Sequence, residues 1–286
     1  MKLRKAISVK TFESLNRRMS FKAHDQFRFT NSQLGSSGEF NFGKYLLNQS
    51  FDYLAIYDSE FEASLCPQLD FIVVTWDMIY LYDIKNFSGN YYYEDGEFFT
   101  SQKKKIRSPF IQLDRAYETL DILLRNAGIQ FPITKRLIFI NPEFQLYGNS
   151  DALPLVTHAQ LNRHFQSIKN RSRKLDQRHH AIADYIESRR YEKDFYDIGI
   201  FYSYDRLKKG VWCCDCVCQA LVSSHRHFLC PACRRYYTKT EAVMHCLYEF
   251  RLLFPEKKIT SVLLRDWCGH TVSLETTRKV LSRYSG

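Results

Sequence analysis

QLDFIVVTWDMIYLYDIKNF, residues 68–87, contains two apolar runs that are separated by a two-residue connection. The runs 68–75 and 78–87 are rich in Val, Ile, Phe and Tyr, a composition typical of strands, and Trp76 and Asp77 are a short enough link to join them as a hairpin. A carboxylate that is buried in such a strand without a partner is costly. The runs nevertheless contain three charged residues, Asp70, Asp83 and Lys85.

These charged residues can come together in the folded hairpin. Side chains alternate between the two faces of a strand, so Asp83 and Lys85 project to the same side. Pairing of the two strands can bring Asp70 close to Asp83, and Glu39, on an expected helix, could add a third carboxylate. Carboxylates with a lysine suit metal-dependent hydrolysis, because Mg²⁺ prefers oxygen ligands and a bound metal activates water. The alternative is a plain ion pair of Asp83 with Lys85, with Asp70 capping the hairpin.

Further elements of both kinds extend outward from the hairpin. Helical patterns occur at 39–47 and 108–128, and strand patterns at 53–61 and 134–141. The Asp-Gly pair at 95–96, between two aromatic runs, indicates a second hairpin. This order of helices and strands predicts an α/β fold with a mixed central sheet.

Four stretches resemble the motifs of one family, namely GEF (38–40), QLDFIVVT (68–75), YDIKNFSGNYY (82–92) and SPFIQLDRA (108–116). They resemble the NERD, or nuclease-related, domain, which is similar to the PD-(D/E)xK nuclease superfamily. The resemblance covers about residues 28–145. It implies a PD-(D/E)xK nuclease-like core and a metal-dependent nuclease that hydrolyses phosphodiester bonds of DNA.

The resemblance also implies roles for particular residues. It implies that Glu39, Asp70 and Asp83 bind Mg²⁺ or Mn²⁺. It further implies that Lys85 assists the attacking water and that Gln112, in the Pro-x-x-Gln start of a helix, positions the site. The family usually has Glu where this chain has Asp83, which is shorter by one methylene group. This departure motivates a second hypothesis, a non-catalytic nucleic-acid-binding or scaffold protein that retains the nuclease fold.

Six of the nine cysteines are clustered in the C-terminal third of the chain. Two Cys-x-x-Cys pairs, Cys213/Cys216 and Cys230/Cys233, are separated by thirteen residues, a spacing typical of a tetrahedral Zn²⁺ site. A redox Cys-x-x-Cys pair is the alternative. Zinc ribbons also commonly follow NERD domains, which favours the same four ligands. Other residues could compete for the metal: Cys214, Cys218, His225 and His227.

The C-terminal segment is expected to be helical. A helix is expected at 240–254, and residues 259–284 read as a helix, a Gly-containing turn and a second helix, which resembles a helix-turn-helix. Plain packing of two short helices is the alternative. The start of the second helix carries the candidate nucleic-acid-binding residues Thr276, Thr277, Arg278 and Lys279. Together with the cysteines, this segment motivates a third hypothesis, a zinc-dependent DNA-binding regulator.

The bulk composition limits the class of protein. The formal net charge is +10, from 41 Lys and Arg against 31 Asp and Glu, which favours a polyanionic partner such as nucleic acid. No apolar run approaches the roughly 20 residues of a membrane span, and the basic N-terminus is not followed by the apolar region of a secretory signal. We therefore expect a cytoplasmic protein that binds DNA and no membrane.

The chain is expected to divide into five segments. The first ends in a loop with the sequence LGSSG after a leading helix, and the third is charged and expected to be helical. The segments are an N-terminal extension (1–34), the NERD nuclease-like domain (35–147), a helical connector (148–208), a zinc ribbon (209–237) and a small C-terminal helical segment that resembles a helix-turn-helix (238–286).

Overall fold

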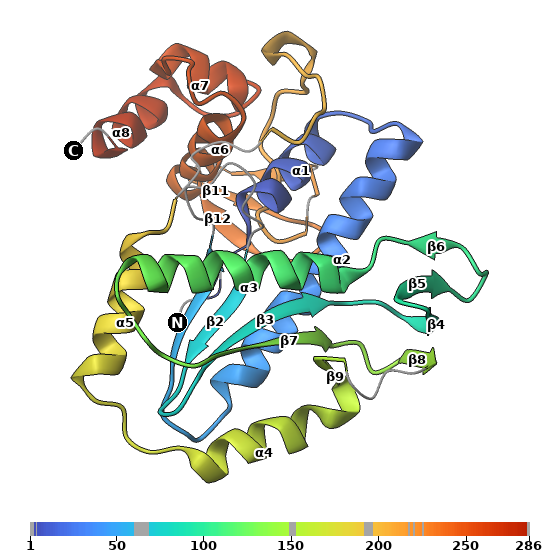
Figure 1. Cartoon of the computed structure of the whole chain (residues 1–286). Coiled ribbons are helices and arrows are strands. Elements are labelled where there is room, and N and C mark those ends of the chain that lie inside the picture. Colours follow the sequence, from blue (N-terminus) through green and yellow to red (C-terminus); the bar gives the residue numbers. More distant parts are fainter. Residues whose placement is uncertain are drawn as a thin grey trace. The chain divides into compact units, whose positions relative to one another are not determined.

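The structure of the chain is a computed structural model (Figure 1). It describes residues 3, 5–59, 69–148, 153–191, 197–216, 218–219, 221–224 and 226–284. The chain divides into two compact units, each made of two segments. Unit 1 comprises Met1–Arg4 and Gln33–Glu192, and unit 2 comprises Lys5–Ser32 and Lys193–Gly286.

Unit 1 is built around a five-stranded mixed sheet. Its order is β1-β2-β3-β7-β9, with antiparallel pairing among the first three strands and parallel pairing of β3 with β7 and of β7 with β9. The predicted hairpin of β2 and β3 and the predicted mixed α/β fold are both confirmed. The strands are β1 (Leu54–Ser59), β2 (Leu69–Val74), β3 (Ile79–Lys85), β7 (Ile133–Phe139) and β9 (Leu155–Thr157). The end of the run expected as the first strand, residues 60 and 61, lies outside the described residues.

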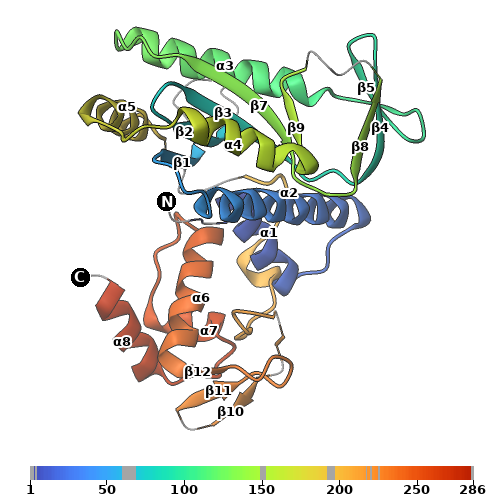
Figure 2. The ribbon, with the colours of Figure 1, turned by 90° about the horizontal axis from the view of Figure 1, so that it is seen from below.

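Helices cover both faces of this sheet, as Figure 2 shows for α3 and α4 on opposite sides. Every residue of β2 is buried, and so is every residue of β3 except Lys85, because each strand packs on both faces. One face carries Phe71 and Tyr82 and packs against α2 and α4, while the other carries Ile72 and Leu81 and packs against α3 and α5. The covering helices are α2 (Ala23–Leu47), α3 (Pro109–Asn126), α4 (Leu161–Arg171) and α5 (Gln177–Ser188).

Helix α2 departs from the sequence prediction. The LGSSG segment, residues 34–38, was expected to be a loop, but it lies within the 25-residue helix Ala23–Leu47. Gly38 explains part of this outcome, since a Cβ atom there would lie 2.7 Å from Cβ of Asn86 and 3.2 Å from the Ile140 side chain. The glycine thus weakens the local helical preference but permits close approach of the helix to the sheet. The boundary between the two units also falls within α2.

A second sheet continues directly from the central hairpin. Its order is β6-β5-β4-β8. Asp95 and Gly96 join β4 to β5 with φ angles of 49° and 84°, which confirms the predicted Asp-Gly turn. One face packs on α3 and β7, with the ring centroids of Phe139 and Phe144 3.7 Å apart. The strands are β4 (Gly89–Glu94), β5 (Glu97–Thr100), β6 (Lys105–Ile106) and β8 (Phe144–Gly148).

The segment expected as a helical connector contributes to the core of unit 1. Phe165 of α4 packs against the β2–β3 face that carries Tyr82, and Ile186 of α5 packs against the opposite face. Asp176 caps α5 by accepting hydrogen bonds from the Arg178 and His179 amides. Two short 3-10 helices, η1 (His158–Gln160) and η2 (Tyr204–Arg206), also lie between residues 148 and 208.

Unit 2 combines helices with a small sheet around one hydrophobic core. Thr260 caps α7 by accepting from the Leu263 amide, and Ser273 accepts from the Thr276 amide at the start of α8, so the predicted pair of C-terminal helices is confirmed. The helices are α1 (Ile7–Arg18), α6 (Lys239–Leu253), α7 (Ser261–Trp267) and α8 (Leu274–Tyr284). The strands, in the order β10-β11-β12, are β10 (Val222–Ser223), β11 (His227–Leu229) and β12 (Tyr236–Thr238).

A buried ion pair lies in the core of unit 2. Arg18 is fully buried; its Nε donates to Glu249 Oε2 over 2.9 Å, and its Nη1 donates to the Lys208 carbonyl over 2.8 Å. The guanidinium lies over the rings of Trp212 and Trp267, at 4.3 and 3.6 Å from their centroids. The main partner of each buried charge is therefore the other charge, and the Lys208 carbonyl and the two tryptophan rings add contacts to Arg18.

We expect Arg18→Ala to lower the free energy of unfolding of unit 2 by about 3–5 kcal/mol, because it leaves the Glu249 carboxylate buried without its partner. Urea unfolding followed by tryptophan fluorescence measures the change, since Trp212 and Trp267 flank the pair. The control Arg278→Ala, at an exposed position on α8, should change stability by less than about 0.5 kcal/mol. Equal effects of the two substitutions would contradict this account.

No described helix combines the length and the apolar character that crossing a bilayer requires.

Candidate functional site

The β2–β3 hairpin places Asp70 beside Asp83. The strands pair Phe71 with Tyr82 and Ile72 with Leu81, so the same antiparallel register, continued by one residue, sets Asp70 opposite Asp83. Asp70 Oδ2 accepts a hydrogen bond from the Ile84 amide at 2.6 Å. The carboxylates of Asp70 and Asp83 are both buried.

Lys85 lies between Asp83 and helix α3. Its Nζ is 2.6 Å from Asp83 Oδ2 and donates a hydrogen bond to Gln112 Oε1 over 3.3 Å. The ion pair that the sequence offered as the alternative reading is therefore present. Asp83 Oδ2 is nevertheless buried and accepts no hydrogen bond of regular geometry from the described residues. This oxygen consequently keeps capacity for a further ligand.

Glu39, on α2, approaches the same group of charges. Tyr57 of β1 donates a hydrogen bond from its hydroxyl to Glu39 Oε2 at 2.9 Å. The charges of Asp83 and Lys85 both act on the Glu39 carboxyl. Contacts of Lys85 and electrostatic interactions thus connect the five residues that were expected at the site, but the three acids do not form a compact group of ligand atoms.

The sequence reasoning missed Tyr57 and Asp58. Tyr57 binds Glu39, and the negative charge of Asp58 acts on both Glu39 and Tyr57. Their strand was expected, and the alternation of its side chains could have shown that Tyr57 faces α2. No motif marked either residue, and the contact depends on how α2 packs on the sheet.

Burial and mutual repulsion raise the pKa values of the three acids. Burial raises the pKa of Glu39 to about 7, against the Tyr57 hydrogen bond and with the repulsion of Asp58. Burial and the Asp83 charge raise the pKa of Asp70 well above its usual range, and burial raises that of Asp83 against the attraction of Lys85. Burial alone would lower the pKa of Lys85, but the neighbouring acids raise it, so the amine stays protonated. The cluster therefore favours the addition of positive charge.

These pKa values predict that the stability of the metal-free protein falls as pH rises from about 4.5 to about 7. The folded state holds protons on these acids that the unfolded state has already lost, so the free energy of unfolding decreases through this window. Urea unfolding at a series of pH values measures the slope. Glu39→Gln should reduce it, and the control Glu118→Gln, at an exposed position on α3, should leave it unchanged. A free energy of unfolding that rises with pH in this window, or a slope that Glu39→Gln leaves unchanged, would contradict the assignment.

The predicted cysteine ligands come together in unit 2. The Sγ atoms of Cys213, Cys216, Cys230 and Cys233 all lie within 4.8 Å of one another. The Sγ–Sγ distance is 3.5 Å between Cys213 and Cys233 and 3.3 Å between Cys216 and Cys230. Four thiolates at such spacing suit tetrahedral Zn²⁺, so the cluster could bind zinc.

The surroundings of the cluster support this choice of ligands over the other candidates. Tyr237 Oη lies 2.7 Å from Cys213 Sγ, and the Asp215 amide donates to the same sulfur over 3.4 Å. Cys214 and Cys218 pack against the hydrophobic core of unit 2 instead of joining the group. Among the competing histidines, His227 lies on β11, and position 225 falls outside the described residues.

We expect the purified protein to contain about one zinc ion per chain, bound by these four thiolates. Cys216→Ser should remove most of this zinc, because a hydroxyl is a much poorer ligand than a thiolate, whereas the neighbouring Cys214→Ser should retain it. Elemental analysis after gel filtration measures the content. Loss of zinc in both variants, or in neither, would contradict the assigned set of ligands.

The four residues that were expected at the second C-terminal helix differ in accessibility. Thr277 is buried, with its hydroxyl bonded to the Ser261 and Leu274 carbonyls. Arg278 and Lys279 are exposed, and Thr276 is half-buried. The structure therefore leaves three of the four open to a ligand.

The fold and the acidic site together indicate a class of protein. A mixed sheet that carries buried acids and a lysine on adjacent strands, covered by helices on both faces, is consistent with a nuclease-like fold. Residues 34–140 match the family model NERD, described as the nuclease-related domain. No curated protein and no solved structure matches the chain.

The matched residues, 34–140, include all four sequence motifs that resembled the family. The match includes α3, the β2–β3 hairpin and the part of α2 that carries Glu39, and it ends just after β7. The cysteine cluster and the C-terminal helices lie outside it. The recognition of a nuclease-related domain is thus confirmed, and it applies to the core of unit 1.

Proposed function

We propose that unit 1 is a metal-dependent nuclease that hydrolyses phosphodiester bonds, with DNA as its substrate. The observation that carries the proposal is the buried group of Asp70, Asp83 and Lys85 at the end of the β2–β3 hairpin, inside the nuclease-related domain. Formal net charge of +10 adds attraction for a polyanionic substrate.

The residues fit a divalent cation such as Mg²⁺ or Mn²⁺. Asp70 and Asp83 would hold it, because Mg²⁺ is commonly bound through one or two carboxylates and retains several waters. The ligand atom from Asp83 would be its buried Oδ2, which contacts Lys85 Nζ at 2.6 Å but accepts no hydrogen bond of regular geometry from the described residues. Glu39 would join through its carboxylate or through a water. The bound cation would polarise the scissile phosphate and lower the pKa of the attacking water.

Lys85 and Gln112 would position the reacting groups. The raised pKa of Lys85 keeps its amine protonated, so it acts as a hydrogen-bond donor and a positive charge rather than as a base. The Gln112 carbonyl accepts from this amine and limits its direction. Lys85 would thereby orient the attacking water and stabilise negative charge that develops on the phosphate. Tyr57 would hold Glu39 in place through its hydrogen bond.

A second candidate is a nucleic-acid-binding or scaffold protein that retains the fold without turnover. Two observations favour it. Lys85 already forms an ion pair with Asp83. In addition, the described acids do not form a group of three with closely spaced ligand atoms, as the four cysteines do. The shorter Asp83 would account for both, since it leaves the carboxylate close to the strand.

A cleavage assay on labelled single- and double-stranded DNA with Mg²⁺ or Mn²⁺ separates the two candidates. We expect Asp83→Asn and Lys85→Met each to lower the cleavage rate by about 10²–10³-fold, as removal of a charged catalytic group does. Glu118→Gln and Lys103→Gln, at exposed positions of unit 1, are the matched controls and should cleave normally. Equal rates in the wild type and all variants would remove these residues from catalysis.

Asp83→Glu restores the acid that is usual in the family and tests the second candidate directly. If the protein is a nuclease, the wild type cleaves and the longer carboxylate changes its rate only modestly. If it is a scaffold protein, the wild type binds DNA without cleavage. A gain of cleavage in Asp83→Glu would then identify the shortened side chain as the cause.

A further inference from the structure

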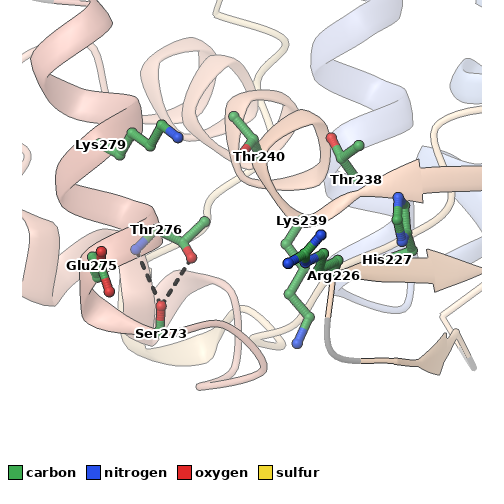
Figure 3. A pocket seen from close by; sticks show the side chains of 9 residues that line it. All are labelled: Arg226, His227, Thr238, Lys239, Thr240, Ser273, Glu275, Thr276 and Lys279. Carbon is green, nitrogen blue, oxygen red and sulfur yellow. Dashed lines mark hydrogen bonds between the residues drawn. The ribbon is translucent and has the colours of Figure 1, made fainter.

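Unit 2 contains a pocket of about 840 Å³ at the junction of its small sheet and its C-terminal helices (Figure 3). Residues of two kinds line it, basic side chains and hydroxyl-bearing side chains, together with one acid. They are Arg226, His227, Thr238, Lys239, Thr240, Ser273, Glu275, Thr276 and Lys279.

Three elements of unit 2 build the walls of this pocket. The β11–β12 hairpin and the first turn of α6 form one wall, and the first turns of α8 form the opposite wall, as Figure 3 shows. The register of the hairpin pairs His227 with Thr238, and the Lys239 amide donates to the Arg226 carbonyl over 3.0 Å. On the other wall, the Ser273 and Thr276 hydroxyls are 2.9 Å apart and hydrogen-bonded. The backbone that presents the lining is thus fixed on both sides.

The lining has an excess of positive charge that is not neutralised locally. Arg226, Lys239 and Lys279 are basic, and Glu275 is the only acid among the lining residues. The ion pairs of the described residues of unit 2 use other basic side chains, namely Lys5, Arg18, Arg28, Arg235 and His270. Three cations from separate elements therefore face one cavity and retain their donors.

This chemistry selects a phosphate group as the ligand. Hydrogen bonds from ammonium or guanidinium groups to phosphate oxygens are among the strong ones in proteins. The hydroxyls of Thr240 and Thr276 can add neutral donors beside the cations. A carboxylate would use only part of this set of donors.

We propose that this pocket binds a backbone phosphate of nucleic acid, which gives unit 2 a nucleic-acid contact of its own. The choice of nucleic acid over a free nucleotide rests on the proposed function of unit 1 and on the net charge of +10. The site lies in unit 2 and contains no residue of the acidic group, so it can bind whether or not unit 1 cleaves.

The proposal assigns different roles to neighbouring residues of α8. Thr276 and Lys279 line the pocket and contact the phosphate. Arg278 is exposed but lies outside the lining, and the buried Thr277 joins α8 to α7 through its bond to the Ser261 carbonyl. Thr276 and Lys279 are three positions apart and lie on the same side of α8, so the helix binds the backbone through this side and does not present a continuous face to the bases.

Fluorescence anisotropy of a labelled oligonucleotide with the full chain tests the proposal. Asp83→Asn is used as the background, so that cleavage does not interfere. We expect Lys279→Gln and Arg226→Gln each to raise the Kd by about 5- to 30-fold. Each should also reduce the slope of log Kd against log salt concentration by about one phosphate contact. The matched controls are Arg278→Gln, next to Lys279, and Lys258→Gln, exposed elsewhere in unit 2; both should stay within about 2-fold of the background.

The outcomes decide the proposal. Equal weakening by Lys279→Gln and Arg278→Gln would show diffuse charge attraction and overturn it. A second combination of results would also overturn it. If the pocket variants bind the oligonucleotide as the background does, and inorganic phosphate or a mononucleotide protects the pocket from hydrogen exchange, the ligand is a small anion. Exchange protection of residues 226–227 and 273–279 by the oligonucleotide, measured in the background protein, supports the proposal even if one variant folds poorly.

The same experiments separate this proposal from the function of unit 1. If the wild type cleaves no substrate but the pocket variants weaken binding, the nuclease assignment fails and the pocket assignment stands. If the wild type cleaves and the pocket variants bind as the controls do, the pocket assignment alone fails.

Discussion

The antiparallel register of β2 with β3 is the constraint on which the rest of unit 1 depends. It sets Asp70 opposite Asp83 inside a sheet that is covered on both faces. A shift of either strand by one residue would turn its acid to the other face, away from the acid of its partner strand. Apolar residues along both strands prevent that shift, because nearly every position of the two strands is buried. The same burial that specifies the register also raises the pKa values of the acids.

Lys85 resolves only part of the resulting charge problem. Its amine is one positive charge near three acids, and it is already paired with Asp83. Asp70 is stabilised by the charge of Lys85 and by the Ile84 amide, and Glu39 mainly by the Tyr57 hydroxyl. Each acid thus has a partner, but the group as a whole still carries excess negative charge when it is ionised. Protons or a divalent cation would remove this excess, and we propose the cation as the functional occupant of the site.

The parts of the fold that could be predicted are those with local or repeating signals. The β2–β3 hairpin, the Asp95-Gly96 turn and the cysteine spacing of unit 2 each carry such a signal, and each is present in the structure. The continuity of α2 could not be predicted. Gly and Ser favour a loop locally, and only the packing of Gly38 against Asn86 shows why a small residue is needed within a helix.

Contacts between distant segments account for the rest of what was missed. Tyr57 meets Glu39 only after α2 packs on the sheet, and Arg18 meets Glu249 across 231 positions of the chain. The basic pocket of unit 2 likewise draws its lining from three separate stretches, of which the sequence marked only the start of α8 as a candidate.

The central claim is that Asp70 and Asp83 hold a catalytic divalent cation. It is tested most directly by a crystal structure grown with Mn²⁺ and measured at the manganese absorption edge. The account predicts an anomalous peak bound by both carboxylates in the wild type and its loss in Asp83→Asn. A fully ordered site with no peak, in which Lys85 keeps its ion pair with Asp83 at saturating Mn²⁺, would contradict it.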